Sequence, residues 1–302
     1  MKLDSLSPNL RGAVLLMMAA AGFSLVAVCI KLLGSGIPIV QIVLVRQLTI
    51  TVLLAPAFRE VGISLLRTER PVLHGVRVSG ALLSMLLGFG AVINLPLADA
   101  TAIGFAKAFF LTIFAVIILR ETVGVYRWSA VAVGFAGVMV MLQPGGTGLS
   151  FWTLAALASA AIVGLIMVVV RLLTKTDSTR TVMAWQAVGV GAAVAPFGLW
   201  FWVWPTPEQW ALLLAMGGIS FLAQRLNIDA YRNGEASMLA SLDYVRLLYA
   251  VLLGFIVFDQ LPSKQTWLGA SIIVLAALFT VYREHRMNRA LLRAAARNEP
   301  GA

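Results

Sequence analysis

The chain has 302 residues, of which 60% are hydrophobic and 12% are charged, whereas an ordinary soluble domain has roughly 25% charged residues. This composition excludes a soluble globular protein and predicts a polytopic membrane protein. A net charge of +10 would indicate nucleic-acid binding in a soluble chain, but here the basic residues gather in short segments between apolar runs. We therefore expect no nucleic-acid partner.

Ten apolar runs are long enough to cross a bilayer as helices, which takes about 20 residues each. In chain order they are residues 12–33, 38–58, 76–95, 100–119, 126–142, 151–172, 181–204, 210–230, 236–258 and 266–282. Alternating the loops places 17 of the 23 basic residues on one side, Arg77 among them, and Lys31 and Lys264 on the other. By the positive-inside rule, we expect an inner (cytoplasmic) membrane protein with both termini in the cytoplasm.

The two halves of the sequence repeat each other. Arg246 aligns with Lys107 at a separation of 139 residues, and Gln186 aligns with Arg46 at a separation of 140. Because each repeat holds five spans, an odd number, the second must enter the membrane from the opposite side to the first. Such inverted repeats are typical of secondary transporters, which place a binding site near the membrane midplane. We expect a first repeat over 1–145, a second over 146–284, and a basic cytoplasmic tail over 285–302.

Three basic residues, Arg46, Lys107 and Arg246, fall near the middle of the second, fourth and ninth spans. At a rise of about 1.5 Å per residue, each lies roughly 10 to 15 Å deep in the bilayer. Three cations at one depth would repel each other unless an anionic group lies between them, so the pattern predicts a substrate-binding site. Alternatively, they are structural charges: Asp243 neutralises Arg246 within one helical turn, and Lys107 and Arg46 bond to backbone carbonyls.

Four other polar residues are candidates for the same site. Asp243 lies one helical turn before Arg246, as either a switchable counter-ion or a permanent ion-pair partner. Gln186 would supply neutral hydrogen bonds if it faces the cavity, and Tyr249 either stacks on a ring-bearing substrate or packs against neighbouring helices. Arg225 is either an inner-gate residue or a side chain that snorkels toward the cytoplasm.

The sequence holds no pattern for catalysis or metal binding. Cys29 is the single cysteine, and His74, which we expect in a cytoplasmic loop, has no ligand partners nearby in the sequence. We find no nucleophile with a base, no metal cluster and no phosphate loop. We therefore expect no enzyme activity, no metal and no cofactor. The patterns leave a homodimer open.

Four local strings resemble the EamA families of the drug/metabolite transporter superfamily, in a ten-helix bacterial branch. They are Leu119-Arg-Glu121, Phe258-Asp-Gln260-Leu-Pro262, Ala106-Lys107-Ala-Phe-Phe110 and Asp243-Tyr-Val-Arg246. The resemblance implies a central cavity lined by the first four helices of each repeat, with the fifth and tenth helices at the periphery. It also implies substrates such as amino acids, S-adenosylmethionine or riboflavin.

Together these observations predict an all-α integral membrane protein with ten transmembrane helices in two inverted five-helix repeats. The expected function is secondary active transport of a small metabolite that bears an anionic group, by alternating access. The alternative is a non-transporting membrane sensor or assembly component whose intramembrane charges are structural. The two differ in whether the central cations line an open cavity or lie against helix backbone.

Overall fold

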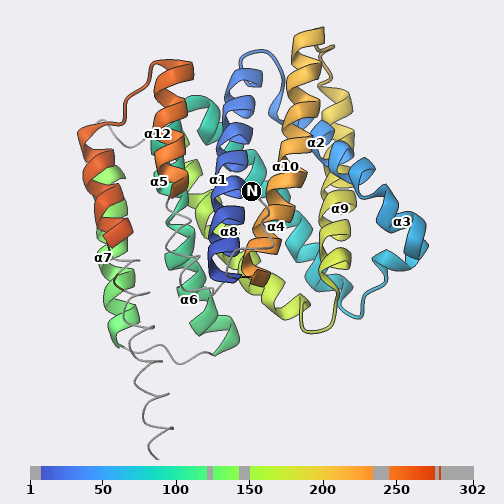
Figure 1. Cartoon of the computed structure of the whole chain (residues 1–302), viewed down its shortest axis with the longest axis horizontal. Helices are drawn as coiled ribbons and strands as arrows, with labels where there is room; N and C mark the ends of the chain where they lie inside the picture. The colour runs from blue at the N-terminus through green and yellow to red at the C-terminus, as the bar shows by residue number, and fades with distance from the viewer. Residues whose placement is uncertain (1–7, 121–124, 143–149, 234–244, 276–278, 280–302) are drawn as a thin grey trace, which may run out of the picture.

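The computed structural model describes residues 8–120, 125–142, 150–233, 245–275 and 279, and over these ranges it contains helices and no strand (Figure 1). The first half comprises α1 (Pro8–Leu33), α2 (Ile39–Leu53), α3 (Ala55–Val61), the 3₁₀ helix η2 (Gly62–Leu66), α4 (Pro71–Asn94), α5 (Leu97–Gly104), α6 (Lys107–Leu119) and α7 (Val125–Leu142). The second half comprises α8 (Phe151–Leu173), α9 (Thr179–Trp200), α10 (Pro207–Asn233), α12 (Val245–Phe258) and a helical stretch over 264–275. The predicted all-α class is confirmed.

Within the described residues, six helices are long and apolar enough to cross a membrane. A seventh is counted if α2 and the α3–η2 segment, which are bent by 48° relative to each other, form one span. Pro56 stands in the first turn of α3, where its missing N–H costs no helical hydrogen bond. The multi-pass membrane prediction is confirmed, while the number of ten spans stays a prediction.

The helix packing reflects the internal duplication. In the repeat, α1 corresponds to α8, α4 to α10 and α2 to α9. Helix α1 packs on α10, and the equivalent pair, α8 and α4, also packs together. Helices α2 and α9, which correspond to each other, are in direct contact. Arg120 and Asp259, which are 139 residues apart, end α6 and α12 in the same left-handed backbone conformation, with φ of 54° and 52°. Because this conformation is uncommon outside glycine, its recurrence at matched positions supports a duplicated chain.

Three helix starts in the second half, those of α8, α9 and the stretch 264–275, follow a Ser-x-x-Thr pattern. The hydroxyl groups of Ser150, Ser178 and Ser263 each accept a hydrogen bond at 3.1 Å from the backbone N–H three residues later. Such N-caps satisfy a donor that the first helical turn would otherwise leave without a partner. In the first half, α4 begins at Pro71, several residues before the predicted start at residue 76. His74 and Arg77, which the sequence analysis counted with the cytoplasmic loop, therefore lie on the helix.

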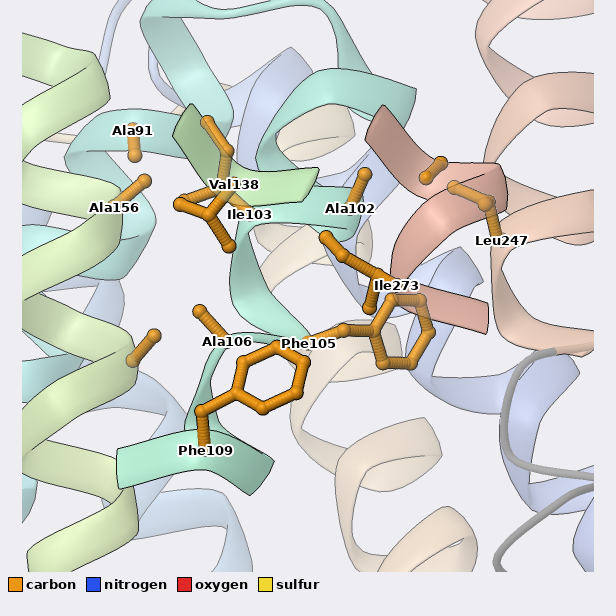
Figure 2. Close-up of a cluster of buried hydrophobic side chains, with 12 residues drawn as sticks. Ala91, Ala102, Ile103, Phe105, Ala106, Phe109, Val138, Ala156, Leu247 and Ile273 are labelled. Atoms are coloured by element: carbon orange, nitrogen blue, oxygen red, sulfur yellow. The ribbon is translucent and has the colours of Figure 1, made fainter. Parts of the chain in front are cut away.

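The predicted fourth span is interrupted between α5 and α6. Phe105 and Ala106 donate backbone hydrogen bonds to Ala102 and Ile103 at 3.1 and 3.0 Å, so the chain tightens into a short 3₁₀ turn. This turn lies in a hydrophobic cluster that draws residues from several helices (Figure 2). The cluster members are Ala91, Ala102, Ile103, Phe105, Ala106, Phe109, Val138, Ala156, Ala160, Leu247, Ala270 and Ile273. It therefore fixes the starts of both α6 and α12.

Helix α7 and the stretch 264–275 lie side by side at one end of the bundle (Figure 1). A Cβ atom built on Gly137 would stand 2.9 Å from the carbonyl oxygen of Gly269. The absence of a side chain at Gly137 thus permits the two backbones to approach closely, as small residues commonly do between membrane helices. This pair takes the peripheral position expected for the fifth and tenth spans.

Candidate functional site

A cavity of about 400 Å³ lies between the two halves of the bundle. Its lining comes from α1, α2, α4, α5 and α6 of the first half and from α8, α9, α10 and α12 of the second. These are the helices that correspond to the first four spans of each repeat. The volume falls within the range of roughly 300 to 1,000 Å³ that is usual for small-molecule sites.

Three cations from three helices line this cavity. Arg46 comes from α2, Lys107 from the first position of α6, and Arg246 from the first turn of α12. Among the lining residues that the structure describes there is no Asp or Glu. Asp243, the expected counter-ion, lies outside the described residues. The structure therefore brings together the three basic residues that the sequence analysis selected.

Arg46 makes hydrogen bonds only to neutral side chains within the described part of the chain. Its Nε donates to Ser220 Oγ at 3.0 Å, and its Nη1 donates to Gln47 Oε1 at 3.0 Å and to Met85 Sδ at 3.7 Å. These contacts orient the guanidinium without neutralising it. Its charge therefore stays available to an anionic group in the cavity.

Lys107 and Arg246 each lie over an aromatic ring. The Lys107 Nζ atom is 6.0 Å from the centroid of Phe105, and the Arg246 Cζ atom is 5.2 Å from the centroid of Phe23. At these distances the negative face of the ring attracts a cation but leaves its net charge in place. Both cations are also next to the hydrophobic cluster in the sequence, since the cluster members Leu247 and Ala106 directly follow Arg246 and directly precede Lys107. Packing in the core thus fixes the positions of both cations.

Gln186, which aligns with Arg46 in the repeat, also lines the cavity. Its side-chain oxygen Oε1 accepts a hydrogen bond from Arg77 Nη2 at 2.5 Å, and Arg77 Nη1 donates to the carbonyl oxygen of Val182 at 2.7 Å. Arg77 is buried, with 5% of its surface exposed. Its assignment to a loop was wrong, because α4 begins at Pro71 and α9 supplies the acceptors for its guanidinium. Pro71 could have revealed the earlier helix start, because proline is common in the first turn of a helix.

His74 was also expected in a loop, and this was wrong. It lies on α4, fully buried, with Nε2 at 2.7 Å from Asp177 Oδ2 and its ring stacked on Trp185 at a centroid distance of 5.0 Å. Thr68 Oγ1 donates a further hydrogen bond to the same carboxylate oxygen at 2.6 Å. Hydropathy alone could not reveal this contact, because it joins two segments about 100 residues apart in the sequence.

Asp177 is ionised more readily than an ordinary aspartate. Burial raises the pKa of its carboxyl group, but the hydrogen bonds from Thr68 and His74 and the nearby charges of His74 and Arg70 outweigh burial, so the pKa is lowered. The carboxylate therefore stabilises the folded state as an anion. It lies in the loop between α8 and α9, outside the membrane-spanning helices.

Two other expected site residues lie away from the cavity lining. The Arg225 side chain is 70% exposed and lies 4.0 Å from the carboxylate of Asp229, whereas the preceding residue, Gln224, lines the cavity. Tyr249 lies one turn after Arg246 on α12 and is described, but it is not among the lining residues. The gate and stacking roles of these two residues stay predictions.

Comparisons with known proteins agree with this architecture. Residues 10–143 and 150–282 each match the model of the EamA-like transporter family. The chain is 31% identical over 240 residues to a riboflavin transporter of Rhizobium johnstonii, with 78% of each chain covered. It is 26% identical over 289 residues to an S-adenosylmethionine uptake transporter of Rickettsia prowazekii, covering 94% of this chain and 96% of the other. A solved crystal structure with 21% identity superimposes with a TM-score of 0.64 over 92% of this chain and 99% of the other, which shows a shared fold.

Proposed function

The chain belongs to the EamA-like transporter family, and we propose that it carries a small metabolite with an anionic group across the membrane by alternating access through the central cavity. It is a multi-pass membrane protein and a small-metabolite transporter rather than an enzyme. We further propose that it resides in the inner membrane with both termini in the cytoplasm, as the distribution of basic residues predicts.

The observation that carries the proposal is the convergence of Arg46, Lys107 and Arg246 on one cavity whose described lining contains no carboxylate. Cations inside a membrane are costly and mark substrate or ion pathways more often than they serve the fold. A carboxylate, phosphate or sulfonate in the cavity would lower the mutual repulsion of the three charges. An anionic metabolite that enters the cavity would thus meet three basic side chains from three helices.

Each site residue takes a distinct role in this mechanism. Arg46, Lys107 and Arg246 hold the anionic group, Gln186 supplies neutral hydrogen bonds and Tyr249 stacks on a ring. Asp243 is the counter-ion that pairs with Arg246 when no substrate is bound, and Arg225 gates the inner side. Because two cations come from the first half and one from the second, a rocking of one half against the other would change the side to which the anion is exposed.

The alternative, a non-transporting sensor or assembly component, requires cations that are bonded against helix backbone. Arg46 instead bonds to three side chains and lines the cavity. Relatives named as transporters of riboflavin and S-adenosylmethionine also favour transport. Both substrates carry oxygen acceptors, and S-adenosylmethionine has a carboxylate that would suit the three cations.

A thermal-shift screen of the purified protein tests the proposal. The panel holds amino acids, S-adenosylmethionine, riboflavin and organic anions, and the screen is repeated on Lys107→Ala and on Lys264→Ala, whose residue is exposed outside the cavity. A ligand present at 100 times its Kd stabilises the folded state by about 2.7 kcal/mol. We expect a shift that persists in Lys264→Ala and disappears in Lys107→Ala. No shift for any member of the panel would contradict the proposed function.

A further inference from the structure

Arg77 is buried next to the candidate site but is absent from its lining. We propose that Arg77 is a positioning residue: it holds the Gln186 side-chain oxygen so that the Gln186 NH₂ group donates a hydrogen bond to an oxygen of the substrate. The inference rests on the proposed function and adds to it a requirement for a carbonyl or carboxylate oxygen at this wall of the cavity.

The orientation of the Gln186 amide follows from the chemistry of its partner. A guanidinium group has only donors, so the atom that faces Arg77 Nη2 at 2.5 Å must be the amide oxygen. The Nε2 group is then directed elsewhere, and it makes no hydrogen bond to any described residue. Gln186 lines the main cavity and also a smaller adjoining one of about 30 Å³. Its two N–H donors are thus left for a ligand.

The backbone of Gln186 is held as firmly as its side chain. Its carbonyl oxygen accepts a hydrogen bond from Gln47 Nε2 at 3.1 Å, and Gln47 Oε1 accepts from Arg46 Nη1 at 3.0 Å. Gln47 is buried, with 1% of its surface exposed. A continuous polar network therefore runs from Arg46 on α2 through Gln47 and Gln186 to Arg77 on α4. An anion bound by Arg46 would meet a Gln186 that is already oriented.

The partners of Arg77 argue against a purely structural role. The guanidinium bonds to a backbone carbonyl and an amide oxygen, and its Nε atom is buried without a partner among the described residues. Burying a charge with neutral partners alone is unfavourable, and an apolar side chain of similar size commonly stabilises a fold as well or better. A role in orienting Gln186 therefore accounts for a buried arginine here better than fold stability does.

Binding measurements on purified variants test the inference, with riboflavin and S-adenosylmethionine as probes. Gln186→Glu keeps an oxygen for Arg77 and adds a charge to that contact, but it removes the NH₂ donor. Riboflavin is uncharged near neutral pH, so the new carboxylate does not repel it. We expect the affinity of Gln186→Glu to fall about tenfold, the loss that one hydrogen bond to a ligand explains, while its melting temperature stays at or above that of the wild type.

A double-mutant cycle separates positioning from other effects. Arg77→Met should weaken binding by a similar factor in the wild-type background and have no further effect in the Gln186→Leu background. Arg67→Met, at an exposed arginine, is the matched control and should bind as the wild type does.

Three results would overturn the inference. The first is a Gln186→Glu variant that binds both probes as the wild type does. The second is an Arg77→Met effect of equal size in both Gln186 backgrounds, because Arg77 would then act through its charge or through the fold. In both cases binding by the wild type would leave the proposed function intact. The third is a wild type that binds neither these probes nor any other member of the thermal-shift panel, because the proposed function then fails and this inference falls with it.

Discussion

The Nε2 atom of His74 lies 2.7 Å from Oδ2 of Asp177, and this contact joins α4 of the first half to the loop that precedes α9 of the second. The side chains are 0% and 5% exposed, so the contact is made away from solvent. Trp185 stacks on the histidine ring and donates a hydrogen bond to the carbonyl oxygen of Leu66 at 2.9 Å. The two halves are thus held together where the α3–η2 segment meets α9.

Asp177→Asn is expected to destabilise the protein by about 2 kcal/mol, since it weakens buried hydrogen bonds to a charged group. The pKa of Asp177 is lowered in the folded state, so its stabilisation is present above the unfolded pKa of about 3.9 and is lost as the pH falls through the folded pKa. Melting temperatures from pH 7 to pH 3 measure this. The difference between wild type and variant should be constant down to about pH 5 and shrink below pH 4.

The control for this measurement is Glu208→Gln, at an exposed carboxylate near the start of α10. It should show no comparable difference from the wild type at any pH. If the difference for Asp177→Asn instead stayed undiminished down to pH 3, ionisation of the Asp177 carboxyl group would not be the source of the stability.

Lys107→Ala and Arg246→Ala are expected to abolish transport without loss of expression or folding. Each removes one of the three cations that line the cavity, and losing a charged partner of a bound anion costs about 2 kcal/mol or more, at least thirtyfold in affinity. The measurement is uptake of the identified ligand into proteoliposomes that contain equal amounts of each variant. Normal uptake by both variants would exclude an anion site built on these residues.

Gly164→Ala is expected to destabilise the bundle and to displace Lys107. A Cβ atom at Gly164 would stand 2.8 Å from the backbone nitrogen of Leu111 and 3.0 Å from the carbonyl oxygen of Lys107, so α8 and α6 would have to separate. Such overpacking typically costs about 1 to 3 kcal/mol. Thermal unfolding in detergent measures the effect.

Gly218→Ala on α10 is the matched control, because a Cβ atom there would meet no atom within 4 Å. Alanine has a higher helix propensity than glycine, so this variant should be as stable as the wild type or more so. Equal melting temperatures for the two variants would contradict the close approach of α8 and α6.

The sequence alone revealed much of this architecture because apolar length and charge placement are strong signals in a membrane protein. Arg46, Lys107 and Arg246 stood out because a cation far from either end of an apolar run has few explanations. Arg77 and His74 were missed for the complementary reason. They lie close to the end of a span, where hydropathy cannot distinguish a side chain that reaches water from one that is satisfied by a neighbouring helix.

The break between α5 and α6 was not predictable from local signals either. Phe105 and Ala106, which form the turn, are ordinary helix residues, and Gly104 is the single helix-weakening residue beside them. The break follows instead from packing, because Phe105 and Phe109 fill a cluster shared with α7, α12 and 264–275 (Figure 2). Tertiary contacts of this kind override local propensity.

Neighbouring residues on α10 offer a final test of the site. Gln224 lines the main cavity and the smaller one, whereas Arg225 is 70% exposed and lies beside Asp229. We expect Gln224→Ala to weaken ligand binding about threefold to tenfold, because it removes a hydrogen-bonding side chain from the cavity wall. Arg225→Ala should leave the affinity unchanged and alter the transport rate, since a gate residue acts on the conformational step rather than on the bound substrate. Equilibrium binding and initial uptake rates on the same preparations separate the two effects. A large loss of affinity in Arg225→Ala would place that residue in the binding site rather than at a gate.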